Sequence, residues 1–142
     1  MDRELLRTTY GISDSRLRDA QTTWDELEEI ERRYATIRSG LDSVGRYVVD
    51  AVLKCPTVHS IKYRLKEPDH LLEKIVRKRC ENPARSITPD NYRSEITDLV
   101  GIRALHLFKE DWLSVHTYIK ETWELTEQPI AYVRSGDSEK IT

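Results

Sequence analysis

Side chains that bind phosphate gather in the middle of this chain. Residues 54–85 carry 9 Lys or Arg and only 4 Asp or Glu, although the whole chain has 25 acidic and 23 basic residues and a net charge of −2. Lys and Arg hold phosphate groups through charge-assisted hydrogen bonds. A basic stretch between acidic flanks therefore indicates a local anion site rather than a general nucleic-acid surface.

The stretch "TVHSIKYRLK", residues 57–66, alternates polar and apolar residues and predicts a strand. Alternate residues of a strand share a face, so Lys62, Arg64 and Lys66 line one side. The other side, which we expect to be packed, carries Ile61, Tyr63 and Leu65. Three cations on one face repel one another unless an anion or carboxylates lie among them.

The next segment, "PDHLLEKIVRKRC", predicts a helix in which Asp69 is a candidate cap. His70, Lys74 and Lys78 recur every four residues and so form one stripe of that helix. The start of a helix also offers free backbone N–H groups to an anion. The strand face, the helix start and the stripe are therefore expected to converge on one polyphosphate. The alternative is that these are solvated side chains of an ordinary surface.

A carboxylate opens the second apolar run, "DLVGIRALHL", which predicts a buried strand. A carboxylate entering such a strand is usually paired, capping a turn or bound to a metal, so Asp98 is a candidate Mg²⁺ ligand beside phosphates. Strict alternation places Asp98 and Arg103 on opposite faces, unless Gly101 allows a bulge. The alternative is a structural ion pair of Asp98 with Arg103 or a lysine. Glu95 is assigned to the preceding loop.

Hydrophobic periodicity predicts an α/β or α+β domain with a small mixed sheet covered by helices. A helical segment over residues 13–54 is capped by Ser13 or Asp14 and breaks at "SGLD". The later predicted elements are a strand over 57–66, a helix over 68–80, a strand over 96–108, a helix over 109–123 and a strand over 128–133. We expect residues 1–53 to be an N-terminal helical region and residues 54–142 to be a second domain.

The composition indicates a soluble, cytoplasmic protein that binds neither a membrane nor DNA. The 2 Cys residues fit a reduced compartment better than a disulfide framework, and no Cys or His spacing is typical of zinc. The first residues are too charged for a signal peptide, and no apolar run has membrane-spanning length.

The segment "RLKEPDHLLEKI" resembles a motif of the synthetase domain of the RelA/SpoT family, which makes the alarmone (p)ppGpp. In that family a strand ends in Arg-x-Lys, a Ser follows four residues later, and a Lys stands four residues beyond the Ser. Arg64, Lys66, His70 and Lys74 occupy these positions here, with His70 in place of the Ser.

The segment "DLVGIR", from Asp98 to Arg103, resembles the next family motif, Asp-Leu-x-Gly-x-Arg. The two motifs occur in the family's order and on the expected elements, and the resemblance covers roughly residues 45–135. The helices before residue 54 resemble those of the small stand-alone members. This resemblance implies a nucleotidyltransferase-like fold for residues 54–142.

The resemblance implies a GTP diphosphokinase, which moves pyrophosphate from ATP to the ribose 3′-hydroxyl of GTP or GDP. Arg64 and Arg103 would sandwich the adenine, since guanidinium planes stack well on bases. Lys66 and Lys74 would hold the phosphates. The imidazole N–H of His70 would add a phosphate contact. By the same resemblance Asp98 would be the catalytic residue that binds Mg²⁺.

The family's later motifs, a Gly-Tyr-x-Ser-x-His segment and a Glu, have no counterpart after Val133. We therefore expect an N-terminal piece of a longer synthetase, which holds the ATP half of the site and is inactive by itself. The family's hydrolase motif is also missing, so we expect the other histidines to be structural or exposed. The interpretations left open are a toxin that pyrophosphorylates tRNA and a non-catalytic nucleotide-binding or interaction module. A homo-oligomer is also left open.

Overall fold

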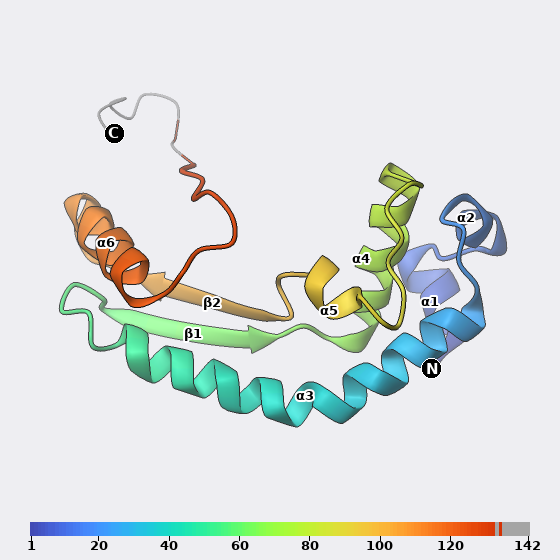
Figure 1. Cartoon of the computed structure of the whole chain (residues 1–142), viewed down its shortest axis with the longest axis horizontal. Coiled ribbons are helices and arrows are strands. Elements are labelled where there is room, and N and C mark those ends of the chain that lie inside the picture. Colours follow the sequence, from blue (N-terminus) through green and yellow to red (C-terminus); the bar gives the residue numbers. More distant parts are fainter. Residues whose placement is uncertain (133, 135–142) are drawn as a thin grey trace.

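The computed structural model, which describes residues 1–132 and Arg134, has a mixed α+β architecture (Figure 1). This confirms the predicted fold class. The elements, in chain order, are α1 (Arg3–Tyr10), α2 (Asp14–Asp19), α3 (Trp24–Val52), β1 (Ser60–Leu65), α4 (Pro68–Glu81), α5 (Tyr92–Glu95), β2 (Val100–Leu105), the 3₁₀ helix η1 (Lys109–Asp111) and α6 (Trp112–Thr122). None of the described helices combines the length and the apolar character needed to cross a membrane.

Side-chain caps define the starts of the N-terminal helices. Ser13, as predicted, accepts a hydrogen bond from the backbone N–H of Arg16 and begins α2. The helix predicted to run on from there instead ends near residue 20, where Gln21 adopts a left-handed φ of 55°. Thr23 then caps α3 by accepting a hydrogen bond from the N–H of Glu26.

The predicted helix break at residues 39–42 is wrong, because α3 runs without interruption over 29 residues. Glycine disfavours a helix interior by only about 1 kcal/mol. Packing on both sides of the predicted break outweighs this preference: Tyr34 is fully buried in the core, and Gly45 lies directly against the Tyr63 ring of β1. Local propensity is thus overridden by tertiary contacts that are not visible in the sequence.

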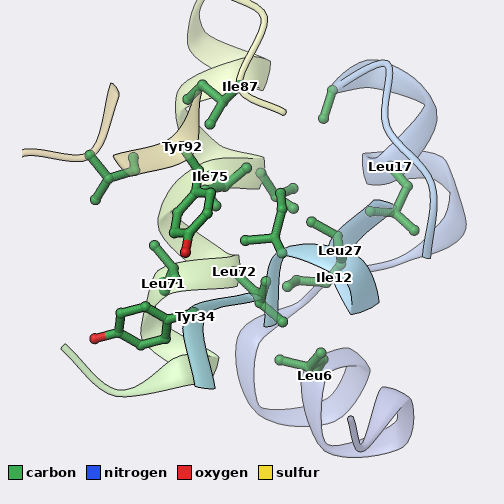
Figure 2. Packing of buried hydrophobic residues seen from close by; sticks show 14 of the residues in the cluster. Leu6, Ile12, Leu17, Leu27, Tyr34, Leu71, Leu72, Ile75, Ile87 and Tyr92 are labelled. Carbon is green, nitrogen blue, oxygen red and sulfur yellow. The ribbon is translucent and has the colours of Figure 1, made fainter. Parts of the chain in front are cut away.

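The main hydrophobic core lies where α1, α2 and the first half of α3 meet α4 (Figure 2). Figure 2 shows Tyr34 of α3 beside Leu71 of α4, and both side chains are fully buried. The same core includes Tyr92 of α5 and Ile96. It therefore joins residues from both sides of position 53, and the proposed division into two domains there stays a prediction.

The sheet consists of two antiparallel strands, with Tyr63 paired to Ile102 and Arg64 paired to Gly101. One face packs on α3, where the hydroxyl of Tyr63 donates a hydrogen bond to Asp42 over 2.8 Å. As predicted, this face carries Ile61, Tyr63 and Leu65, which are half-buried, whereas Lys62 and Arg64 on the other face are exposed. The helix α3 therefore covers one face of the sheet only.

The second strand differs from its prediction, because β2 is half-exposed rather than buried and begins only at Val100. The third predicted strand is wrong for residues 128–132, which have no regular structure, and Val133 lies outside the described residues. The sequence also predicts a turn over residues 134–142, which lies outside the described residues apart from Arg134. The predicted helix over 109–123 is confirmed as η1 and α6, at the end of the sheet far from α4 (Figure 1). There the Tyr118 hydroxyl donates to the Ala51 carbonyl over 2.6 Å.

Candidate functional site

The open face of the sheet brings three cationic side chains together. Lys62 is paired directly with Arg103, and Arg64 is paired with Gly101, two residues earlier in β2. Paired residues of an antiparallel sheet share a face, so Arg64 and Arg103 are diagonal neighbours, with a separation of about 7–8 Å between their backbones. Within the part of the chain that the structure describes, none of these three side chains has an ion-pair partner.

A hollow of about 450 Å³ lies at this position and is lined from both strands by Lys62, Tyr63, Arg64, Gly101, Ile102 and Arg103. Its volume is in the range of small-molecule sites. Gly101 faces Arg64 without a side chain, and a Cβ built there would meet only the Arg64 carbonyl oxygen, at 3.9 Å. The glycine therefore leaves open space between the two arginines rather than relieving a clash.

A second cluster, the Asp98 cluster, consists of Asp98, Lys66 and Lys74. Lys66 follows β1, Lys74 lies in α4, and Asp98 lies in the turn before β2 rather than in the strand. The Lys66 Nζ is 3.0 Å from Asp98 Oδ2, and the Lys74 Nζ is 2.8 Å from Oδ1. Asp98 therefore forms the ion pair with lysine that the sequence offered as the alternative to a metal ligand, and it is not paired with Arg103.

The backbone around the Asp98 cluster is fixed from two sides. The N–H of Lys66 donates to the Leu99 carbonyl over 2.9 Å, which ties the end of β1 to the turn that carries Asp98. The Tyr34 hydroxyl donates to the Lys66 carbonyl over 2.6 Å. The sequence did not predict this role for Tyr34, which is one of several apolar residues at helical spacing.

The electrostatics of the Asp98 cluster favour an ionised carboxylate. Partial burial of Asp98 acts to raise its pKa, but the hydrogen bonds from Lys74 and Lys66 outweigh burial and hold the pKa below its usual range. The side chains of Lys66 and Lys74 are only 11% and 20% exposed, compared with 46% for Asp98. The lysines are therefore the enclosed members of the cluster and the carboxylate is its accessible member.

The predicted basic stripe of α4 does not act as one surface. His70 makes an edge-on ring contact with Tyr10 of α1, with 5.5 Å between the ring centroids. Lys78 lies 3.9 Å from Glu81 in the last turn of the helix. Only Lys74 of the stripe contacts Asp98, and the expected convergence of His70 and Lys78 on the same phosphate stays a prediction. One helical turn separates each residue from the next, so each meets a different neighbour.

Asp69, the candidate cap of α4, lies inside the helix, whose N-cap is Glu67 without a capping side-chain bond. Pro68 takes the first helical position, where its missing N–H leaves no donor unsatisfied. The predicted capping role of Asp69 is therefore wrong.

Arg79 explains part of the positive charge in the middle of the chain, and it has no access to a ligand. The residue is 7% exposed, and its guanidinium donates to the carbonyls of Ala20, Gln21 and Ile87. It also lies 3.4 Å from the carboxylate of Glu26. Its position on the buried stripe of α4, three and four residues after Val76 and Ile75, was the sequence signal for this structural role.

The carboxylate chemistry of the site fits Mg²⁺ only when phosphates complete its coordination. Asp98 supplies one carboxylate, and Glu95, the nearest acidic residue in the sequence, is paired with Arg85 over 2.8 Å. Within the described residues no group of three His, Cys, Asp or Glu side chains gathers that could hold a metal ion. Mg²⁺ commonly binds through one or two carboxylates together with substrate phosphates, so this donor set suits a metal that arrives with a nucleotide.

The other histidines lie apart from the Asp98 cluster. The ring of His106 is hydrogen-bonded to the carbonyl of Phe108 over 2.7 Å, and His116 contacts the Trp112 ring on the same helix. These contacts account for two of the histidines without any ligand.

These features define an α+β protein with a cationic sheet face and an acid–lysine cluster at one end of that face. The family model described as "Region found in RelA / SpoT proteins" matches residues 63–139, a range that includes Arg64, Lys66, Lys74, Asp98 and Arg103 but not Lys62. The chain therefore belongs to the RelA/SpoT family, whose members are pyrophosphotransferases of the (p)ppGpp synthetase type. No curated protein and no solved structure matches the chain.

Proposed function

We propose that this chain binds ATP together with Mg²⁺ and supplies the donor site for transfer of pyrophosphate to the 3′-hydroxyl of GTP or GDP. The observation that carries the proposal is the arrangement of two arginines, which have no ion-pair partner among the described residues, beside Gly101 and next to the Asp98 cluster. Arg64 and Arg103 lie diagonally across the strands, and the lysines lie just beyond the end of β1.

The spacing of the arginines suits a planar base. A guanidinium interacts with an aromatic ring when it lies within about 6 Å of the ring centroid. Two guanidinium groups that start about 7–8 Å apart can therefore lie on both faces of one ring. Gly101 leaves the space between them free, and the adenine of ATP is the ring that we assign to it.

The order of residues along β1 sets the direction of the nucleotide. Lys62, Arg64 and Lys66 follow one another toward α4, and Lys74 approaches from that helix. A base held at Arg64 and Arg103 places the phosphates near Lys66 and Lys74, whose charges stabilise the negative charge that develops during transfer. Asp98 would hold Mg²⁺, which neutralises phosphate charge when bound.

The reaction is a substitution at the β-phosphorus of ATP. The acceptor 3′-oxygen forms a bond to that phosphorus and loses its proton, while the bond from the β-phosphorus to the oxygen of the α-phosphate breaks. AMP leaves, and the acceptor gains the β- and γ-phosphates as a pyrophosphate group. Lys66 and Lys74 act by position and charge, which supplies most of the catalysis in phosphoryl transfer.

Calorimetric titration with a non-hydrolysable ATP analogue and Mg²⁺ tests donor binding. Arg64→Ala and Arg103→Ala are each expected to weaken binding by roughly 2- to 30-fold, which corresponds to the loss of one cation–π contact. Arg93→Ala removes an exposed arginine of α5 outside the site and serves as the matched control. Unchanged affinity in both site variants, with both variants folded, would refute the assignment of the sheet face.

A product assay with labelled ATP, run on the full-length gene product, then distinguishes the acceptors. We expect label in guanosine tetra- or pentaphosphate when the assay contains GDP or GTP. Label in tRNA instead would overturn the acceptor assignment while leaving the donor site intact. ATP binding without transfer to any of the three acceptors would favour a nucleotide-binding module.

A further inference from the structure

Asp98 is the counter-ion of two enclosed lysines. Each of its carboxylate oxygens accepts from one ammonium group, Oδ2 from Lys66 at 3.0 Å and Oδ1 from Lys74 at 2.8 Å. Enclosed charges need a partner, because water can no longer solvate them fully. The two ammonium groups to which phosphates would bind are therefore already neutralised in part by the chain itself.

Among the described residues, Asp98 is the one carboxylate within ion-pair distance of Lys66 or Lys74. The carboxylates directly beside these lysines in the sequence are paired elsewhere: Glu67 with Arg38 at 3.0 Å and Glu73 with Arg16 at 3.3 Å. The hydrogen bonds from the Lys66 N–H to the Leu99 carbonyl and from the Tyr34 hydroxyl to the Lys66 carbonyl hold the backbone of the cluster in place.

A metal-free triphosphate and a Mg²⁺-bound triphosphate are expected to interact with the Asp98 cluster differently. A metal-free triphosphate brings only negative charge, so its oxygens must compete with the Asp98 carboxylate for the lysines and lie beside that carboxylate at close range. A Mg²⁺-bound triphosphate brings a cation that prefers carboxylate oxygen. The carboxylate can then exchange its two lysines for the metal while the lysines take the phosphates.

We propose that Asp98 makes the site selective for the Mg²⁺ complex of a triphosphate and against the metal-free triphosphate, because it occupies Lys66 and Lys74 until the metal ion takes its carboxylate. The proposal rests on the function proposed above and adds the form of the substrate. Its distinctive consequence is that removal of the carboxylate improves the binding of the metal-free ligand.

The test measures the affinity of the chain for inorganic tripolyphosphate and for ATP by calorimetry, once with excess chelator and once with Mg²⁺. Asp98→Asn is expected to bind metal-free tripolyphosphate about 5- to 10-fold more tightly than the unchanged chain, because two partly exposed ion pairs no longer compete. For the same variant, the increase in affinity for tripolyphosphate on adding Mg²⁺ is expected to be smaller than for the unchanged chain by a similar factor. Asp98→Ser is the second variant, and a thermal melt of each variant reports folding.

Asp90→Asn is the matched control, because Asp90 is paired with Arg33 at 2.7 Å on α3, away from the Asp98 cluster. We expect this control to leave both affinities unchanged. Weaker or equal binding of metal-free tripolyphosphate by both folded Asp98 variants would overturn the selectivity proposal alone, provided that the unchanged chain binds ATP. If the folded, unchanged chain binds ATP in neither condition, the proposed function fails and this inference fails with it.

Discussion

Two glycines of α3, Gly40 and Gly45, are expected to respond to the same substitution in opposite directions. A Cβ built at Gly40 meets nothing within 4 Å, whereas a Cβ built at Gly45 lies 2.6 Å from Cδ2 and 2.9 Å from Cε2 of the Tyr63 ring. Both residues lie in the interior of one continuous helix. Comparing the two substitutions therefore separates the effect of helix propensity on stability from the effect of contact with the sheet.

Gly40→Ala should stabilise the chain by about 0.5–1 kcal/mol, because alanine is the better helix former and nothing obstructs its methyl group. Gly45→Ala gains the same propensity but forces the Tyr63 ring to move, and overpacking of this kind costs about 1–3 kcal/mol. The ring is held at its far end by the hydrogen bond to Asp42. The net result at Gly45 should be a loss of up to about 2 kcal/mol.

Urea unfolding of the two variants measures both free energies against the unchanged chain. At this chain length a difference of 1 kcal/mol also moves the melting temperature by roughly 2–5 °C. Equal effects of the two substitutions would contradict the close contact of α3 with β1. Destabilisation by Gly40→Ala would contradict the unbroken helix, since a break at this position needs the backbone freedom of glycine.

Three further substitutions probe the site and its support. Gly101→Val should weaken ATP binding at least tenfold in a titration, because the valine side chain fills the space between the two arginines. A thermal melt should show a melting temperature close to that of the unchanged chain. Arg79→Met should destabilise the chain by about 3 kcal/mol in urea unfolding, since it leaves three carbonyls without their donor and the Glu26 carboxylate without its cation. Tyr34→Phe should lower the free energy of unfolding by about 1 kcal/mol through loss of the bond to the Lys66 carbonyl. Full stability of the Arg79 or Tyr34 variant would refute the corresponding contact.

Local patterns predicted the parts of the fold that depend on neighbouring residues. The alternation in β1 identified its packed and open faces, and the cap at Ser13 fixed the start of α2. The family motifs pointed to Lys66, Lys74 and Asp98, which the structure brings into direct contact. These features follow from side-chain period and from short-range hydrogen bonds, which a sequence displays directly.

The missed features depend on contacts between distant residues. The continuity of α3 rests on Tyr63, which follows Gly45 by 18 positions, and the burial of Arg79 rests on carbonyls of the α2–α3 turn and of Ile87. Asp98 was placed in a strand because apolar residues follow it, yet the ladder with β1 begins only at Val100. A run of apolar residues does not show at which residue a strand begins to pair with its neighbouring strand.

Most basic side chains in the middle of the chain fall into three physically different groups. One group lies on the open sheet face without an ion-pair partner among the described residues, one is paired with Asp98, and one is structural or paired along α4, as with Arg79 and Lys78. Counting charge along the sequence combined these groups into one expected anion site. Only the first two groups form the site that we propose.

The most direct test of the central claim compares the affinities for ATP and for inorganic tripolyphosphate, both with Mg²⁺, in the unchanged chain and in Arg64→Ala/Arg103→Ala. If the arginines hold the adenine and the lysines hold the phosphates, the double variant loses most of the preference for ATP and keeps its affinity for tripolyphosphate. An unchanged preference for ATP in the folded double variant would contradict the placement of the nucleotide on this face.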